Sequence, residues 1–188
     1  MHFLSQRLLN GLFLGALAAA CLLPADGAYA ASAEEIDIKV DAALQTFREK
    51  VGGADEFLAS SKGVLVFPSV FKAGIGIGGE YGEGAMRVGG KTVGYYSTAS
   101  ASIGFQLGAQ SKTVIIVFMQ QDALEKFLNS SGWEVGVDGS VALVELGAGG
   151  SIDTTNIRDP IVGFVFGNKG LMYNLTLEGS KITKLKSK

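Results

Sequence analysis

The sequence predicts an α+β domain with a Gly-rich, mainly antiparallel β-sheet or barrel-like core, an N-terminal amphipathic helix and one further helix. Two observations lead to this class. Apolar residues first repeat at helical spacing, and after residue 60 the hydrophobic period changes to two, which is typical of strands. The chain also has 27 glycines, many at alternate positions of these strand-like segments. Such glycines leave a bare face that another backbone or a ring can approach closely.

The first 30 residues have the features of a secretory signal peptide. Arg7 supplies a positive charge, a short apolar run follows, and Ala28-Tyr29-Ala30 ends the segment with an A-x-A site. The run is shorter than the roughly 20 residues that a membrane-spanning helix needs. Cleavage after Ala30 predicts an exported protein, periplasmic or associated with the cell envelope. The alternative is a lipoprotein, because Cys21 follows three alanines as in a bacterial lipobox.

Residues 31–188 are expected to form a single domain, since this length suits one hydrophobic core. The net charge is −2, so no global field attracts nucleic acid. His2 and Cys21, the single histidine and cysteine, both lie in the signal segment. The domain therefore lacks the residues for histidine or thiol catalysis and for a zinc site. We expect no catalytic residue, no metal and no cofactor.

Helices are predicted at three places. Ser32 and Glu35 form a capping box for a helix that runs to Val51, with an acidic outer face and an apolar inner face that suits packing on a sheet. A short helix follows over residues 55–60. The third covers residues 121–130, with Asp122 as its cap.

Alternation predicts a series of strands, with tight turns at Gly89-Gly90 and Gly179-Ser180. Gly74, Gly76 and Gly79 also spell G-x-G-x-x-G, but the glycines that follow exclude the helix that a dinucleotide-binding loop needs. The candidate strands are residues 64–67, 74–78, 85–88, 91–96, 101–108, 113–119, 134–146, 163–167, 171–178 and 181–185.

Five blocks in this order resemble the SYLF domain family. They are SKGVLVFPSVFKAGIGIGGEYGEGAMRV, YSTASASIGFQLGAQSKTVIIVFM, DALEKFLNSSGWEVGVDGSVALV, GAGGSID and FGNKGLMYNLTLEGSKITKL, and the likeness runs from about residue 54 to 185. Eukaryotic members, among them fungal and animal proteins with an SH3 domain and plant proteins with a FYVE finger, are described as binding phosphoinositides and, in fungi, actin filaments. Bacterial members are exported single domains, and this sequence contains neither partner domain.

The resemblance implies a non-enzymatic module of the cell envelope that binds an anionic phospholipid or phosphoinositide-like head group, and it leaves the protein partner unknown. Lys62, Lys72 and Lys169 fall at matched basic positions, and Lys181 and Lys184 lie in the basic C-terminal stretch. These lysines are the candidates for phosphate contacts, because an ammonium group binds phosphate as a point charge.

Two alternatives stay open. One is a small envelope hydrolase that uses paired carboxylates as acid and base, either Glu80 with Glu83 or Asp138 with Glu145. Acids among glycines also close turns or accept backbone hydrogen bonds, which weighs against this use. The other alternative is a structural or interaction protein of the envelope.

Overall fold

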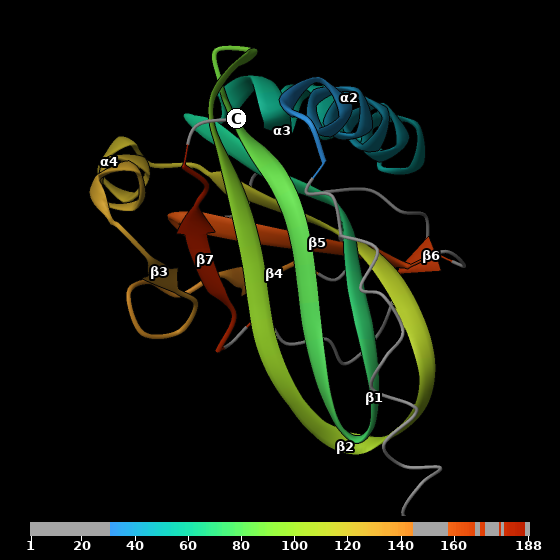
Figure 1. The fold of residues 1–188 in the computed structure, drawn as a ribbon. Coiled ribbons are helices and arrows are strands. Elements are labelled where there is room, and N and C mark those ends of the chain that lie inside the picture. Colours follow the sequence, from blue (N-terminus) through green and yellow to red (C-terminus); the bar gives the residue numbers. More distant parts are fainter. Residues whose placement is uncertain (1–30, 145–157, 168–169, 172–176, 178, 187–188) are drawn as a thin grey trace, which may run out of the picture. The chain divides into compact units, whose positions relative to one another are not determined.

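The computed structural model describes residues 31–144, 158–167, 170–171, 177 and 179–186. They belong to one compact unit that spans residues 31–188. The predicted α+β class is confirmed: helices pack on a curled, mostly antiparallel sheet (Figure 1). Among the described helices, none is long and apolar enough to cross a membrane.

The first two helices lie where the sequence predicts them. α2 (Ala33–Lys50) begins after Ser32, whose hydroxyl oxygen accepts a hydrogen bond from the Glu35 N–H at 3.1 Å. This bond is one half of the predicted capping box, and it satisfies an N–H group that has no partner within the helix. α3 (Ala54–Ser60) follows after Gly53, which adopts the left-handed conformation at φ 81°.

The third helix, α4 (Gln121–Asn129), is also confirmed, but its predicted cap is wrong. The N-cap residue is Gln120, and Asp122 lies in the first turn of the helix. An acidic side chain at this place still interacts favourably with the positive end of the helix dipole. The buried face of α4 carries Leu124 and Phe127.

One long antiparallel hairpin dominates the sheet. It consists of β1 (Gly63–Val88) and β2 (Lys91–Phe118), joined by the predicted turn at Gly89 and Gly90, whose φ angles are 55° and 78°. The six separate strands expected between residues 64 and 119 are wrong, because they are segments of these two strands. Glycine within a strand permits a bend without ending the hydrogen-bonded ladder. A glycine-rich position in the alternating pattern therefore marks a bend of the strand here and not its end.

The hairpin curls back on itself. A register shift between Gly74 and Gly76 divides β1 into a first arm, residues 63–74, and a second arm, residues 76–88. Figure 1 shows β1 and β2 turning together, so that each strand descends and returns.

The two arms of β1 approach each other closely through glycines. A Cβ atom added at Gly84 would overlap the carbonyl oxygen of Val66, and one added at Gly82 would lie 2.8 Å from the carbonyl oxygen of Ser69. The bare glycine face predicted from the sequence is thus confirmed at these two positions, where it makes room for the opposite backbone.

β2 is the central strand and has a different second partner in each half. Its C-terminal half pairs with β5 (Ile161–Gly167), and residues 96–99 pair with β7 (Lys181–Lys184). β6 (Gly170–Leu171) pairs antiparallel with the last residues of β5. The strand beside β2 is therefore β5 along one part of the sheet and β7 along another.

The strand expected over residues 134–146 is wrong in its described part. β3 (Trp133–Glu134) pairs with β7, and β4 (Ala142–Leu143) pairs in parallel with β5, with a turn between them. Gly179 makes the predicted turn, at φ 75°. Most of the strand expected over residues 171–178 lies outside the described residues.

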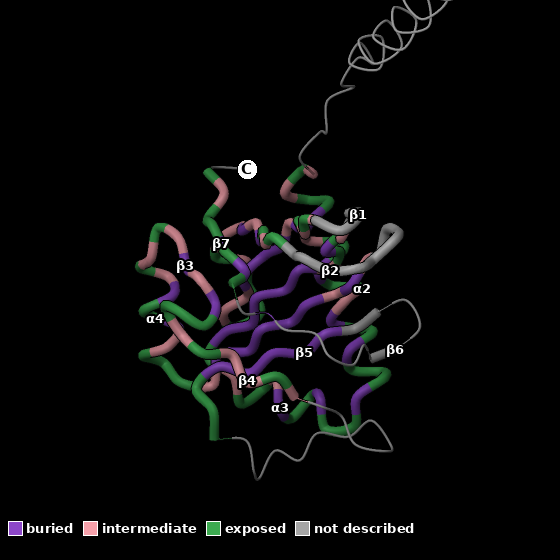
Figure 2. Tube along the Cα trace, turned by 90° about the horizontal axis from the view of Figure 1, so that it is seen from below, coloured by how far each residue is buried: buried purple, intermediate pink, exposed green. Residues whose placement is uncertain are grey.

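Buried side chains form one cluster on each face of the sheet, and Figure 2 shows them concentrated in β5 and the strand segments beside it. The helices α2 and α3 cover one face, and α4 packs on the other, where Trp133 of β3 and Ile182 of β7 are also buried. The helix-side cluster is Ile36, Val40, Leu44, Phe47, Val51, Ala54, Phe57, Val64, Val66, Ala85, Ile115, Val117, Val162 and Phe164. The opposite cluster includes Leu65, Phe67, Met86, Tyr96, Ile116, Phe118, Leu124, Phe127, Trp133 and Ile182.

Candidate functional site

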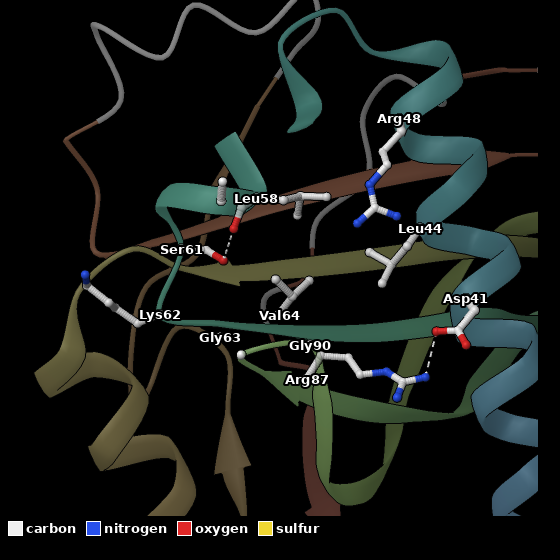
Figure 3. Close-up of a pocket in the computed structure, with 12 residues that line it drawn as sticks. Asp41, Leu44, Arg48, Leu58, Ser61, Lys62, Gly63, Val64, Arg87 and Gly90 are labelled. Atoms are coloured by element: carbon white, nitrogen blue, oxygen red, sulfur yellow. Dashed lines mark hydrogen bonds and ion pairs between the residues drawn. The ribbon is translucent and has the colours of Figure 1, made fainter. Parts of the chain in front are cut away.

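A pocket of about 460 Å³ lies between the two N-terminal helices and the β1–β2 turn (Figure 3). Its apolar lining is Leu44, Leu58 and Val64, and it also includes Gly89 and Gly90 of the turn. Three basic side chains from three different elements line it: Arg48 of α2, Lys62 before β1, and Arg87 near the end of β1. The volume falls in the range of pockets that hold small ligands.

Arg87 is the most firmly held of these basic groups. Its guanidinium donates to the Thr92 hydroxyl at 2.6 Å and to Asp41 Oδ1 at 2.7 Å, and it lies 3.3 Å from Asp37 Oδ1. Thr92 and Tyr95 donate to the two carboxylate oxygens of Asp37 at 2.8 Å each. This network fastens α2 to the last residues of the hairpin and thereby fixes one wall of the pocket.

The network also changes the acidity of a tyrosine. The hydrogen bond from Tyr95 to Asp37 raises the pKa of the Tyr95 phenol, and partial desolvation acts in the same direction. Burial raises the pKa of Tyr96 on the opposite face. Both phenols are therefore neutral near neutral pH; the Tyr95 hydroxyl donates to Asp37, whereas the buried Tyr96 hydroxyl has no hydrogen-bond partner within the described residues.

The remaining carboxylate partners of the two pocket arginines are exposed. Arg48 Nε lies 2.9 Å from Asp55 Oδ1, and the side chain of Asp55 is 79% exposed. The side chain of Asp41 is 70% exposed, whereas that of Arg87 is 14% exposed. Exposed ion pairs contribute little to stability, typically about 0–1 kcal/mol. The Arg48–Asp55 pair, in which both side chains are exposed, can therefore separate at small cost.

Lys62, predicted as a phosphate contact, lies at the rim of this pocket. Its backbone N–H donates to the carbonyl oxygen of Phe118 at 2.8 Å, which fixes the position of the residue, while its side chain is exposed. Figure 3 shows the ammonium group pointing outward, away from the cavity. Within the described part of the chain no carboxylate pairs with it, and its long stem can rotate toward a ligand.

Exposed lysines cluster around the same end of the sheet. The start of β1, the β1–β2 turn and the end of β7 lie together there (Figure 1), with Lys184 opposite Tyr96 and the Leu185 N–H bonded to the Tyr95 carbonyl at 2.9 Å. We call this region the basic end. Its exposed lysines are Lys62, Lys91, Lys184 and Lys186.

The other predicted lysines are not in this group. Lys181 is exposed on β7, but it lies opposite Ala99, farther along the sheet. Lys72 lies at the far end of the first arm of β1 and is paired with Glu80. Lys169 and Cys21 lie outside the described residues.

Lys72 belongs to an interior ion cluster on the inner side of the curl. Glu80 Oε1 lies 3.4 Å from Lys72 Nζ, and Glu80 Oε2 lies 2.5 Å from Lys112 Nζ. The side chains of Lys112 and Glu80 are 5% and 9% exposed. The cluster joins the two arms of β1 to the central strand β2, so Lys72 takes part in holding the hairpin curled.

The carboxylate pairs of the hydrolase alternative do not converge where they are described. Glu80 points inward to the lysines, while Glu83 accepts a hydrogen bond from the Tyr81 hydroxyl at 3.0 Å on the outer face. Asp138 accepts the Glu134 N–H at 2.7 Å and thus closes a turn. Its proposed partner Glu145 lies outside the described residues.

Arg48 and Arg87 are the pocket residues that sequence reasoning missed. Arg48 falls within the predicted N-terminal helix and Arg87 within the strand predicted over residues 85–88, and no motif singles out either residue. Helical spacing from Asp37 to Asp41 placed two carboxylates on one face of α2, but nothing in the sequence indicated which strand would meet them.

The fold and the site define the class of this protein. It is an α+β domain built on one curled hairpin, with arginines that line a surface pocket. Residues 99–188 match the model of the family described as "Ysc84: Las17-binding protein actin regulator", which is the SYLF domain family. The match confirms the resemblance seen in the sequence blocks, and the family is not one of known enzymes. No curated protein matches the chain.

Proposed function

We propose that the domain is a non-enzymatic module that attaches reversibly to anionic membrane surfaces through the basic end. The observation that carries this proposal is that the end of the sheet with the pocket of Arg48 and Arg87 also carries four exposed lysines, Lys62, Lys91, Lys184 and Lys186. Each lysine close to an anionic bilayer contributes about 1 kcal/mol. Two exposed acidic residues lie at the same end, Asp122 after β2 and Asp159 before β5, so the attraction is weak and sensitive to salt.

The proposal is tested by sedimentation of residues 31–188 with vesicles of phosphatidylcholine alone and with added phosphatidylglycerol. Binding is expected only to the anionic vesicles, and salt near 0.5 M should weaken it by screening. The double variant Lys62→Gln with Lys184→Gln should bind about 30-fold more weakly, since each lysine contributes about 1 kcal/mol. Lys39→Gln with Lys126→Gln removes the same charge from exposed sites on α2 and α4 and should bind like wild type. Equal losses in the two double variants would contradict a localised site.

Export to the cell envelope is part of the same proposal, since such a protein meets anionic lipid outside the cytoplasm. Mass spectrometry of the envelope fraction should find a chain that starts at Ala31, or a lipidated one that starts at Cys21. A cytoplasmic chain that retains Met1 would contradict this part.

A protein-interaction role is the second candidate, because the family description names a protein, Las17, and actin regulation. It takes precedence if the vesicle assay shows no binding to any lipid composition.

A further inference from the structure

We propose that the inner side of the curl binds a monovalent, monatomic anion, which is chloride in ordinary solutions, beside the ammonium group of Lys112. The site lies within the core cluster on the face of the sheet opposite α2 and α3. It is separate from the surface pocket and does not depend on the proposed function. The anion acts there as a counter-ion that helps to hold the hairpin curled.

The first argument is the charge balance of the interior ion cluster. Lys72 and Lys112 meet one carboxylate, that of Glu80, so the cluster carries one surplus positive charge. The side chains of Lys112 and Glu80 are almost fully buried, and that of Lys72 is 20% exposed. A buried charge without a counter-charge is costly. One monovalent anion next to the cluster would balance it.

The second argument is a small cavity that adjoins this cluster. It has a volume of about 10 Å³ and is lined by Glu80, Lys112, Thr98 and Ser180, together with apolar side chains of the core opposite the helices. Such a volume has room for about one water-sized particle. The cavity therefore suits a monatomic ion and is too small for a phosphate, a carboxylate or a lipid head group.

The third argument is the chemistry of the lining. An ammonium group has three N–H donors, and within the described residues Lys112 Nζ is paired with Glu80 alone. Thr98 and Ser180 are 8% and 7% exposed, and neither hydroxyl is hydrogen-bonded to another described residue. The ammonium group and the two hydroxyls can all donate to one anion. Glu80 also lines the cavity and repels an anion, but each of its two oxygens is paired with a lysine.

The lining also connects separate parts of the sheet. Thr98 and Lys112 lie in the two halves of β2, Glu80 lies in the second arm of β1, and Ser180 directly precedes β7. An anion bound to these groups contacts segments that come together only in the folded domain. Because it binds the folded chain and not the unfolded one, it should raise the melting temperature.

The first experiment is thermal melting of residues 31–188 in mixtures of sodium chloride and sodium gluconate at one ionic strength and pH. Gluconate carries the same charge but is too large for the cavity. The melting temperature should rise by a few degrees as chloride replaces gluconate and should then reach a plateau, as mass action requires for one site. Equal melting throughout the series would overturn the proposal.

Variants separate this site from general effects of salt on the protein surface. Thr98→Val combined with Ser180→Ala removes both hydroxyl donors, and Lys72→Gln removes the surplus charge, so each should lose most of the chloride-dependent rise. Ser69→Ala removes an exposed hydroxyl that pairs with Ser111 at 2.8 Å outside the cavity, and it should keep the full rise. A full rise in the cavity variants would overturn the assignment of the site.

The second experiment needs no variant that must fold. Bromide replaces chloride in many binding sites and gives an anomalous X-ray signal, so crystals of the unsubstituted domain are soaked in sodium bromide. A bromide peak within hydrogen-bonding distance of Lys112 Nζ and the hydroxyls of Thr98 and Ser180 would support the site. Density for a water molecule only would overturn it. A bromide peak without any chloride effect on melting would mean an adventitious ion only and would overturn it as well.

Discussion

Carboxylates meet basic side chains on both sides of the sheet, in two very different environments. On the inner side of the curl, Glu80 and Lys112 are 9% and 5% exposed and lie 2.5 Å apart. At the surface, the carboxylates that pair with Arg87 and Arg48, Asp41 and Asp55, are 70% and 79% exposed. Separating the inner pair leaves charges that water cannot reach, whereas separating an outer pair only exchanges one partner for water. The inner charges therefore belong to the fold, and the outer charges are available to a ligand.

The largest effect is expected from removing the charge of Glu80. Glu80→Gln keeps the shape of the side chain but leaves Lys112 buried without a counter-charge, which should lower the free energy of unfolding by about 3 kcal/mol or more. Urea titration measures it. Glu83→Gln, on the outer face of the same strand, is the control and should change stability by less than about 0.5 kcal/mol.

A second change would sharpen this result. Replacing both Glu80 and Lys112 by apolar residues of similar volume should recover much of the loss, because buried ion pairs often contribute little compared with a well-packed apolar pair. If Glu80→Gln itself is as stable as wild type, the inner cluster is not what holds the arms together.

The next largest effect is expected where the arms of β1 touch. Gly84→Ala places a Cβ against the carbonyl oxygen of Val66, and such overpacking costs about 1–3 kcal/mol. Gly79→Ala is the matched control in the same strand, because its nearest neighbour, the carbonyl oxygen of Ser100, lies at an ordinary 3.8 Å. Thermal melting of both variants tests the contact, and equal melting temperatures would show that the arms can move apart freely.

The smallest effect is expected in the pocket. Asp55→Asn removes an exposed partner of Arg48 and should change the free energy of unfolding by less than about 0.5 kcal/mol. The measurement is urea titration at low and high salt, and the small difference should vanish at high salt. A loss as large as that of Glu80→Gln would mean that Arg48 is needed by the fold and is not available to a ligand.

Local signals in the sequence predicted the helices and the turn. The Ser32–Glu35 spacing located the start of α2, and two adjacent glycines located the β1–β2 turn. Both features depend on contacts between residues a few positions apart. The sequence correctly predicts that glycines within β1 leave room for a close backbone approach. It does not predict that they lie in one continuous, bent strand, and several short strands were expected in its place.

The candidate site could be predicted only in part. Lys62 and Lys72 are both candidates because the family blocks place them at matched basic positions, and their contact with phosphate stays a prediction. Arg87 contacts Asp37, which is 50 residues away in the sequence, so no local pattern indicates this pair. The curl of the hairpin likewise brings Glu80 to Lys72, and no local pattern reveals such a partner.

Hydrogen exchange of residues 31–188, measured with and without vesicles that contain phosphatidic acid, tests the central claim most directly. The account predicts slower exchange in the two segments that line the pocket at the basic end, residues 58–63 and 87–92, and no change in β5, which is buried in the sheet. Protection confined to the bend of the hairpin around residues 74–78, with the pocket segments unchanged while the protein binds the vesicles, would contradict it.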